Sequence, residues 1–135
     1  MDELKLKLCD IQGRLFELSA KKKYESSAFV KAFMTSEVAK ALDSDYNRMQ
    51  WAGEEYLLEE LASVVGEALV DGEAFAEDVL YWIGYIYRYW HCYTGEESTK
   101  IYKQAPVETM KRNYLMFHTM SPELAIEDLK EIYRQ

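Results

Sequence analysis

The sequence predicts an all-α fold, with about six or seven helices packed in a single compact domain around a central aromatic-rich helix. Apolar residues recur at three- and four-residue steps along most of the chain. No run alternates polar and apolar residues as a half-buried strand would, and only six glycines and two prolines interrupt the helical pattern. A length of 135 residues is that of one ordinary domain, so we expect residues 1–135 to form one unit.

Three helices are expected in the first 50 residues. The first, of about 17 residues, follows from one apolar stripe formed by Leu4, Leu8, Ile11, Leu15 and Leu18. The lysine run at 21–23 breaks this pattern and predicts a loop, and the apolar segment 27–34 predicts a short second helix. A third helix is expected over 36–49, because Thr35 or Ser36 can accept a hydrogen bond from a free backbone N–H at its start.

The middle of the chain predicts two longer helices with a turn between them. Residues 53–69 carry an apolar flank formed by Tyr56, Leu57, Leu61, Val64, Val65 and Leu69. Asp71-Gly72 predicts a turn, and a long helix is expected over 73–93. Gly95 follows it where a residue in the left-handed conformation commonly ends a helix.

The C-terminal segment predicts three shorter helices. Pro106 separates two candidates at 97–105 and 107–120. Ser121 and Pro122 predict the start of the last helix, with serine as the N-cap and proline at the first helical position. We expect its apolar side to be formed by Leu124, Leu129 and Ile132.

The segment YWIGYIYRYWHCY, residues 81–93, is unusual because seven of its thirteen residues are aromatic. On a helix with about 100° per residue, its apolar side chains cover about 240° of the circumference, which is typical of a helix at the centre of its domain. The remaining sector holds Gly84, Arg88 and His91. Three interpretations stay open. The sector could face solvent, it could form the floor of a groove in which Arg88 binds a carboxylate or phosphate, or Arg88 could be buried in a pair with an acid from residues 36–80.

Acidic residues are concentrated in the middle of the chain. The net charge is −8, and residues 36–80 contain two basic and twelve acidic residues, whereas residues 1–35 carry a net +2 and residues 81–135 are neutral. This distribution repels nucleic acid and favours a basic protein partner. Solvated helix faces would produce the same pattern.

The sequence lacks the motifs of the common catalytic and metal sites. His91 and His118 belong to no Glu-x-x-His pair, and Cys9 and Cys92 form no CxxC motif. There is no GxSxG motif and no glycine-rich phosphate loop. We therefore expect no enzymatic activity, no metal and no cofactor.

The expected location is the cytoplasm. The N-terminal segment MDELKLKLCDIQ is charged and amphipathic, unlike a signal peptide. No stretch approaches the roughly 20 apolar residues that a membrane helix needs. Two cysteines are too few for a disulfide framework, which is in keeping with a reducing compartment.

An alternative function follows from residues 36–53, SEVAKALDSDYNRMQWAG. Their Val-Ala-x-x-Leu pattern and the Met that follows mimic a helix-turn-helix, so a transcriptional regulator is one alternative. The second helix would offer Asn47, Arg48 and Gln50 to a DNA groove. The neighbouring carboxylates oppose phosphate contact, so nucleic acid is not the expected partner.

Two blocks of the chain resemble a known family. They are FMTSEVAKALDSDYNRMQWAGEEYLLEEL and YWIGYIYRYWHCYTGEESTKIYKQAP, which is followed by FHTM and LAIEDL. They resemble a family of small, acidic, helical bacterial proteins often encoded beside toxin–antitoxin genes. The resemblance covers most of the chain after residue 29 and carries over no catalytic residue. It implies an antitoxin-like or immunity-like role.

The leading prediction is a non-enzymatic protein-interaction module that neutralises a toxin with a basic cleft by occluding it. Acidic residues would steer association and aromatic residues would anchor it. The expected contact residues are Trp51, Glu54, Glu55, Tyr56, Tyr87, Arg88 and His91. A second alternative is a small-molecule binder or enzyme built around Arg88 and His91. The partner's identity and the oligomeric state stay open.

Overall fold

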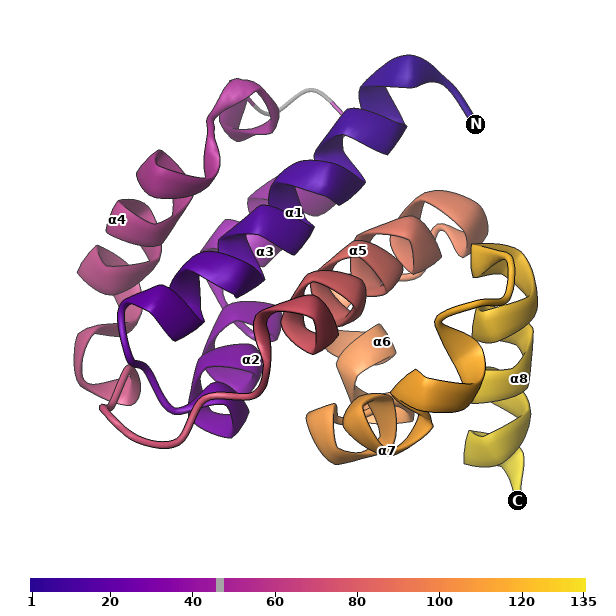
Figure 1. Cartoon of the computed structure of the whole chain (residues 1–135). Helices are drawn as coiled ribbons and strands as arrows, with labels where there is room; N and C mark the ends of the chain where they lie inside the picture. Colours follow the sequence, from indigo (N-terminus) through magenta and orange to yellow (C-terminus); the bar gives the residue numbers. More distant parts are fainter. Residues whose placement is uncertain (46–47) are drawn as a thin grey trace.

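In the computed structural model, which describes residues 1–45 and 48–135, the chain folds into eight α-helices and two short 3₁₀-helices (Figure 1). The α-helices are α1 (Glu3–Lys21), α2 (Ser26–Met34), α3 (Glu37–Asp43), α4 (Glu54–Val65), α5 (Glu77–Thr94), α6 (Ser98–Gln104), α7 (Val107–Phe117) and α8 (Pro122–Arg134). The all-α prediction is confirmed, although the described residues form slightly more than six or seven helices. One buried apolar cluster takes residues from all eight α-helices.

The centre of the fold is the contact between α1 and α5, which lie side by side in Figure 1. Two glycines allow the two helices to approach closely. A Cβ atom on Gly84 would lie 2.6 Å from the backbone oxygen of Gln12, and one on Gly13 would lie 2.7 Å from the ring of Tyr81. Because contacts this short are not tolerated by real Cβ atoms, both positions require glycine, and Gly84 lines a helix interface rather than a groove.

Aromatic rings fill the space between α1, α2 and α5. The ring of Phe16 packs edge-on against Phe29, Phe33 and Tyr87, with centroids 5.3, 5.4 and 6.3 Å away. Tyr87 is only 1% exposed, and its hydroxyl donates to the backbone oxygen of Ala105. The expectation that Tyr87 contacts a partner is therefore wrong, because its ring is part of the core.

The predicted helix boundaries are correct where a local capping signal exists. The side chain of Ser36 accepts a hydrogen bond from the backbone N–H of Ala39, and Ser121 does the same for Leu124. Gly95 follows α5 with a positive φ of 80°.

Three other predicted boundaries are wrong. α3 ends at Asp43 and not at 49, α4 ends at Val65 before a 3₁₀ turn, and α5 begins at Glu77 and not at 73. The segment before α5 is extended because it pairs with the start of α2. The N–H of Ser26 donates to the backbone oxygen of Glu73, and its hydroxyl accepts from Phe75 N–H. These long-range hydrogen bonds compete with a further helical turn.

The apolar faces of α4 and α8 are rotated relative to the predicted ones. In α4 the buried residues are Leu57, Leu58 and Leu61, whereas Tyr56 and Val64 are exposed. In α8 the buried residues are Ala125, Ile126 and Leu129, and the predicted Leu124 and Ile132 point outward. Leu57, Leu61 and Leu129 are buried as predicted, whereas Leu58, Ala125 and Ile126 complete the buried faces in place of the predicted neighbours.

The helix α4 lies at one edge of the molecule, next to α1, with its outer side facing away from the other helices (Figure 1). None of the helices in the described part of the chain has both the length and the apolar content to cross a membrane.

Candidate functional site

The outer side of α4, together with the 3₁₀-helix η1 (Arg48–Trp51) before it, carries an exposed group of acidic and aromatic residues. We call this group the acidic–aromatic face, and it consists of the exposed residues Trp51, Glu55, Tyr56 and Glu59 and the partly buried Glu60. Trp51 is 76% exposed and Tyr56 is 49% exposed, which is uncommon for large rings outside binding surfaces. Burial of Leu57, Leu58 and Leu61 against the core leaves Tyr56 and Glu59 on the opposite side of the helix. Glu60 lies at the flank between the two sides.

Within the described part of the chain, the carboxylates of this region have no protein partner. Among the described residues, the side chains of Glu54, Glu55, Glu59 and Glu60 make no hydrogen bond or ion pair, and α4 itself contains no basic residue. Glu54 and Glu55 lie in the first turn of α4, where the N-cap Gly53 has no side chain and negative charge stabilises the helix dipole. Glu59 and Glu60 lie beyond that turn, so the helix dipole does not account for them.

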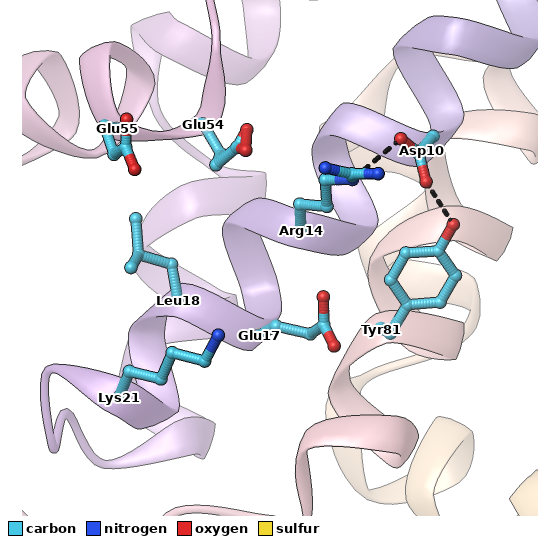
Figure 2. Close-up of a pocket in the computed structure, with 8 residues that line it drawn as sticks. All are labelled: Asp10, Arg14, Glu17, Leu18, Lys21, Glu54, Glu55 and Tyr81. Carbon is cyan, nitrogen blue, oxygen red and sulfur yellow. Dashed lines mark hydrogen bonds and ion pairs between the residues drawn. The ribbon is translucent and has the colours of Figure 1, made fainter.

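A groove of about 500 Å³ separates the start of α4 from α1 (Figure 2). In Figure 2, Glu54 and Glu55 lie on the α4 side, and Arg14, Leu18 and Lys21 of α1 lie opposite them. Because Leu18 is apolar and the surrounding side chains are charged, the groove can accept a side chain with an apolar stem and a polar head.

The far end of this groove is closed by a chain of polar contacts between α1 and α5. Asp10 forms an ion pair with Arg14 at 2.9 Å and accepts a hydrogen bond from the hydroxyl of Tyr81 at 2.5 Å (Figure 2). Burial, together with the hydrogen bond to the Asp10 carboxylate, raises the pKa of Tyr81 above its ordinary value. Tyr81 therefore stays protonated and holds Asp10 in place as a donor.

Arg88 lies at the junction of four helices and is 1% exposed. Its Nε donates to Gln12 Oε1 at 2.8 Å, one terminal nitrogen donates to Asp43 Oδ1 at 2.7 Å, and the other donates to Ser98 Oγ at 3.3 Å. Asp43 also accepts from the backbone N–H and the hydroxyl of Ser98. We call Arg88, Asp43, Gln12 and Ser98 the internal polar cluster, and it joins α1, α3, α5 and α6.

This cluster decides between the three interpretations of the polar sector of α5. The solvent-facing interpretation is wrong, because Arg88 is buried and each of its three nitrogens already donates to a protein acceptor. The groove-floor interpretation is not borne out as a set of three residues. Arg88 and His91 line one pocket of about 350 Å³, but Gly84 packs against α1 and is not among its lining residues. The third interpretation, a buried pair with an acid from residues 36–80, is confirmed with Asp43 as that acid. Arg88 is therefore not a surface contact residue.

His91 lies beside the internal polar cluster and is partly buried. Its Nδ1 is 2.7 Å from the backbone oxygen of Glu96 and 3.6 Å from the Asp43 carboxylate. The short contact to a carbonyl places the proton on Nδ1, so the ring is oriented by the backbone. His91 lines a pocket of about 350 Å³ with Cys92 and Lys5, on the side of the molecule where α1 begins.

The two cysteines lie across the α1–α5 interface from each other and are both free thiols. A hydrogen bond between the two thiols raises the pKa of Cys9 and lowers the pKa of Cys92. Burial acts against ionisation of both thiols, and the positive charge of Arg88 favours it.

Among the described residues of 36–53, no second α-helix follows α3 as a helix-turn-helix requires. After α3, residues Arg48–Trp51 form a single 3₁₀ turn, and Gln50 is buried with its amide donating to the backbone oxygens of Leu42 and Ser44. Asn47, the third expected base contact, lies outside the described residues. Asp43 ends α3 and is used by the internal polar cluster, so the turn is shaped by tertiary contacts.

Of the seven predicted contact residues, the structure brings Trp51, Glu54, Glu55 and Tyr56 together at the start of α4, whereas Tyr87, Arg88 and His91 are elsewhere. The sequence interpretation missed the α1 side of the groove. The side chains of Asp10, Arg14, Glu17 and Lys21 lie on one face of α1, and their alternating charges at helical spacing were the available signal.

Within the described residues, histidine, cysteine and carboxylate side chains form no group of three or more that could hold a metal ion. Comparisons with protein-family models, with curated proteins and with solved structures found no match to this chain.

Proposed function

We propose that the protein is a non-enzymatic, antitoxin-like interaction module that binds a basic protein partner through the acidic–aromatic face of α4. The observation that carries the proposal is the combination of unpaired carboxylates with two exposed rings on one edge of the molecule. Elsewhere, ion-paired carboxylates such as Asp43 and Glu96 help to join helices. Glu59 and Glu60 join nothing within the described chain, so they are available for a partner.

The two kinds of residue have different roles in this proposal. Carboxylates raise the rate at which a basic surface is encountered and reject acidic competitors. Trp51 and Tyr56 provide rigid apolar area that a partner can desolvate, and such residues commonly dominate binding energy. The groove between α1 and α4 offers a place for one basic side chain, with Leu18 beneath its stem and Glu54 beside its charge.

The family resemblance of residues 33–61 supports the same proposal, since that block contains most of the acidic–aromatic face. An antitoxin-like role means that the partner is a toxin whose basic active cleft is covered by this face. Occlusion needs no catalytic group on the antitoxin. It requires shape and charge complementarity only.

The test is affinity capture from the source cells with three forms of the tagged protein. The first is the wild type. The second is the face variant, in which Glu55, Glu59 and Glu60 are all replaced by glutamine. The third is a charge-matched control in which the exposed carboxylates Glu97, Glu127 and Asp128 are replaced by their amides. Both variants change the net charge by the same amount, so they separate the position of the charges from their number.

The proposal expects one stoichiometric basic protein to be retained by the wild type and the control and to be lost from the face variant. Expression of that protein alone should stop growth, and co-expression with the wild type should restore it. Equal retention by the face variant, or the absence of any stoichiometric protein, would contradict the proposal.

A further inference from the structure

A second groove, of about 530 Å³, shares Glu17 and Tyr81 with the α1–α4 groove. It is formed by α1, α5 and α7, and its main lining residues are Glu17, Tyr81, Trp82, Tyr85, Tyr114 and His118. We call it the aromatic groove. Its volume lies within the range of about 300–1,000 Å³ that is typical of small-molecule sites.

The rings of this groove are fixed relative to one another. Trp82 packs edge-on against Tyr114 with centroids 5.7 Å apart, and Tyr114 stacks on His118 at 4.4 Å. Tyr81 and Tyr85 are neighbours on α5, with centroids 5.9 Å apart. Contacts between the rings limit their rotation, so little entropy is lost when a ligand binds against them.

Two of the tyrosines donate their hydroxyl protons to carboxylates. Tyr81 donates to Asp10, and Tyr114 donates to Asp78 at 3.2 Å. A phenol that donates to an anion gains electron density in its ring, which makes the ring face more attractive to a cation. These hydrogen bonds therefore strengthen cation–π contacts between the two tyrosine rings and a bound cation.

The groove also contains negative charge that the protein does not neutralise. The carboxylate of Glu17 has no hydrogen bond or ion pair with any residue of the described chain, and Asp78 stands at the rim. No lysine or arginine is among the residues that line the groove. Arg14 and Lys21 lie on the same face of α1, but they form ion pairs with Asp10 and Glu77 and not with Glu17. The partly buried Glu17 carboxylate therefore faces the aromatic rings without an ion pair of its own in the described chain.

We propose that the aromatic groove binds a small organic cation, an ammonium or guanidinium ion with apolar substituents. Its charge pairs with Glu17, and its apolar substituents pack against Tyr85 and Trp82. Cation–π contact and one carboxylate together favour such an ion over a neutral molecule of the same shape and over any anion. This site shares Glu17 and Tyr81 with the α1–α4 groove but contains no residue of the acidic–aromatic face, so choline binding and partner capture by the face variant can fail separately.

The test uses choline as the cation and 3,3-dimethylbutan-1-ol as its neutral counterpart of nearly the same shape. Each is titrated into the isotopically labelled full chain at constant ionic strength, with the indole N–H of Trp82 and the backbone amides of Tyr85 and Tyr114 followed by NMR. We expect saturable shifts for choline with a Kd on the order of 1 mM. The neutral alcohol should bind about 10-fold more weakly or not at all.

Three variants locate the interaction. Glu17→Gln removes the charge and Tyr85→Leu removes one ring but keeps an apolar side chain, and each should weaken choline binding by about 2- to 30-fold. Glu54→Gln is the matched control, since Glu54 lines only the α1–α4 groove and its loss should leave binding unchanged. The side chain of Glu17 makes no hydrogen bond or ion pair within the described chain. Glu17→Gln should therefore keep the thermal midpoint of the wild type, even if Tyr85→Leu does not.

Four results would overturn the inference. The first is the absence of a saturable shift with choline up to about 100 mM, roughly 100 times the expected Kd. The second is equal binding of choline and the neutral alcohol, and the third is choline binding that is unchanged in Glu17→Gln. The fourth is a set of shifts confined to residues of α4, which would assign the cation to the α1–α4 groove.

Discussion

The internal polar cluster and the acidic–aromatic face contain the same kinds of charged group in opposite circumstances. Arg88 is buried and Asp43 is partly buried, their charged groups are 2.7 Å apart, and each has further hydrogen bonds. Glu59 and Glu60 lie at the edge of the molecule without a partner in the described chain. The charged groups of the internal polar cluster hold helices in position, whereas the carboxylates of the acidic–aromatic face make no such contact within the described chain. Substitutions in the internal polar cluster should therefore lower the free energy of unfolding. Substitutions in the acidic–aromatic face should weaken partner binding and leave stability nearly unchanged.

The largest expected effect is that of Arg88→Met. It leaves Asp43 and Gln12 without their partner in a buried site, so the free energy of unfolding should fall by about 3–5 kcal/mol in urea denaturation. The matched control is Arg14→Met, which removes an exposed ion pair with Asp10 and should cost about 0.5 kcal/mol or less. A loss below about 1 kcal/mol for Arg88→Met would mean that the cluster does not hold the helices together.

The second largest effect is expected for a substitution at the close contact between α1 and α5. Gly84→Ala places a Cβ 2.6 Å from the backbone oxygen of Gln12, so the helices must move apart, at a cost of about 1–3 kcal/mol measured by thermal and urea unfolding. The control is Gly53→Ala, where a Cβ meets nothing within 4 Å and the expected cost is about 0.5 kcal/mol, from the poorer N-cap of α4 alone. Equal stability of the two variants would show that α5 has room to adjust.

A smaller effect concerns pH and the carboxylate of Glu96. Burial alone would raise the pKa of Glu96, but hydrogen bonds from Lys130, Trp90 and Gln104 outweigh it and lower the pKa to about 2. Because the folded-state pKa is below the ordinary value of 4.5, the stabilisation is present above pH 4.5 and is lost as the pH falls toward 2.

The measurement is the free energy of unfolding at several pH values in that window. The wild type should lose on the order of 1 kcal/mol more than Glu96→Gln, after allowance for solvent screening of this partly exposed group. If the two proteins lose stability in parallel between pH 4.5 and 2, Glu96 is not the group responsible.

The smallest effect on stability is expected for the acidic–aromatic face. Trp51→Ala and the triple replacement of Glu55, Glu59 and Glu60 by glutamine should each change the free energy of unfolding by no more than about 0.5 kcal/mol. Trp51 is 76% exposed, and the carboxylates have no partner to lose. A loss of several kcal/mol in either variant would place these residues in the fold and not on a free surface.

The contrast also explains which features could be predicted from the sequence. The caps at Ser36, Gly95 and Ser121 were predictable because they depend on residues within one helical turn. The central position of α5 followed from its apolar circumference. The approach of α1 to α5 was not predictable, because Gly13 and Gly84 are 71 positions apart and each alone suggests only a weak point in a helix.

The partners of charged residues were the hardest part of the site to predict. Arg88 was identified as unusual, and burial against an acid of the middle segment was one of three open interpretations, but the sequence did not single out Asp43. Tyr56 and Tyr87 are both tyrosines in helical segments, yet one is exposed and the other is in the core. Exposure depends on how each helix is rotated against its neighbours, which a single sequence constrains only loosely.

The most direct test of the central claim is the salt dependence of the Kd between the captured partner and the three forms of the protein, measured by calorimetry. The account predicts the same Kd and the same salt dependence for the wild type and the charge-matched control. The face variant should bind at least about 10-fold more weakly, with a shallower salt dependence. Identical Kd values for all three forms at low salt would contradict the claim that the unpaired carboxylates of α4 serve a partner.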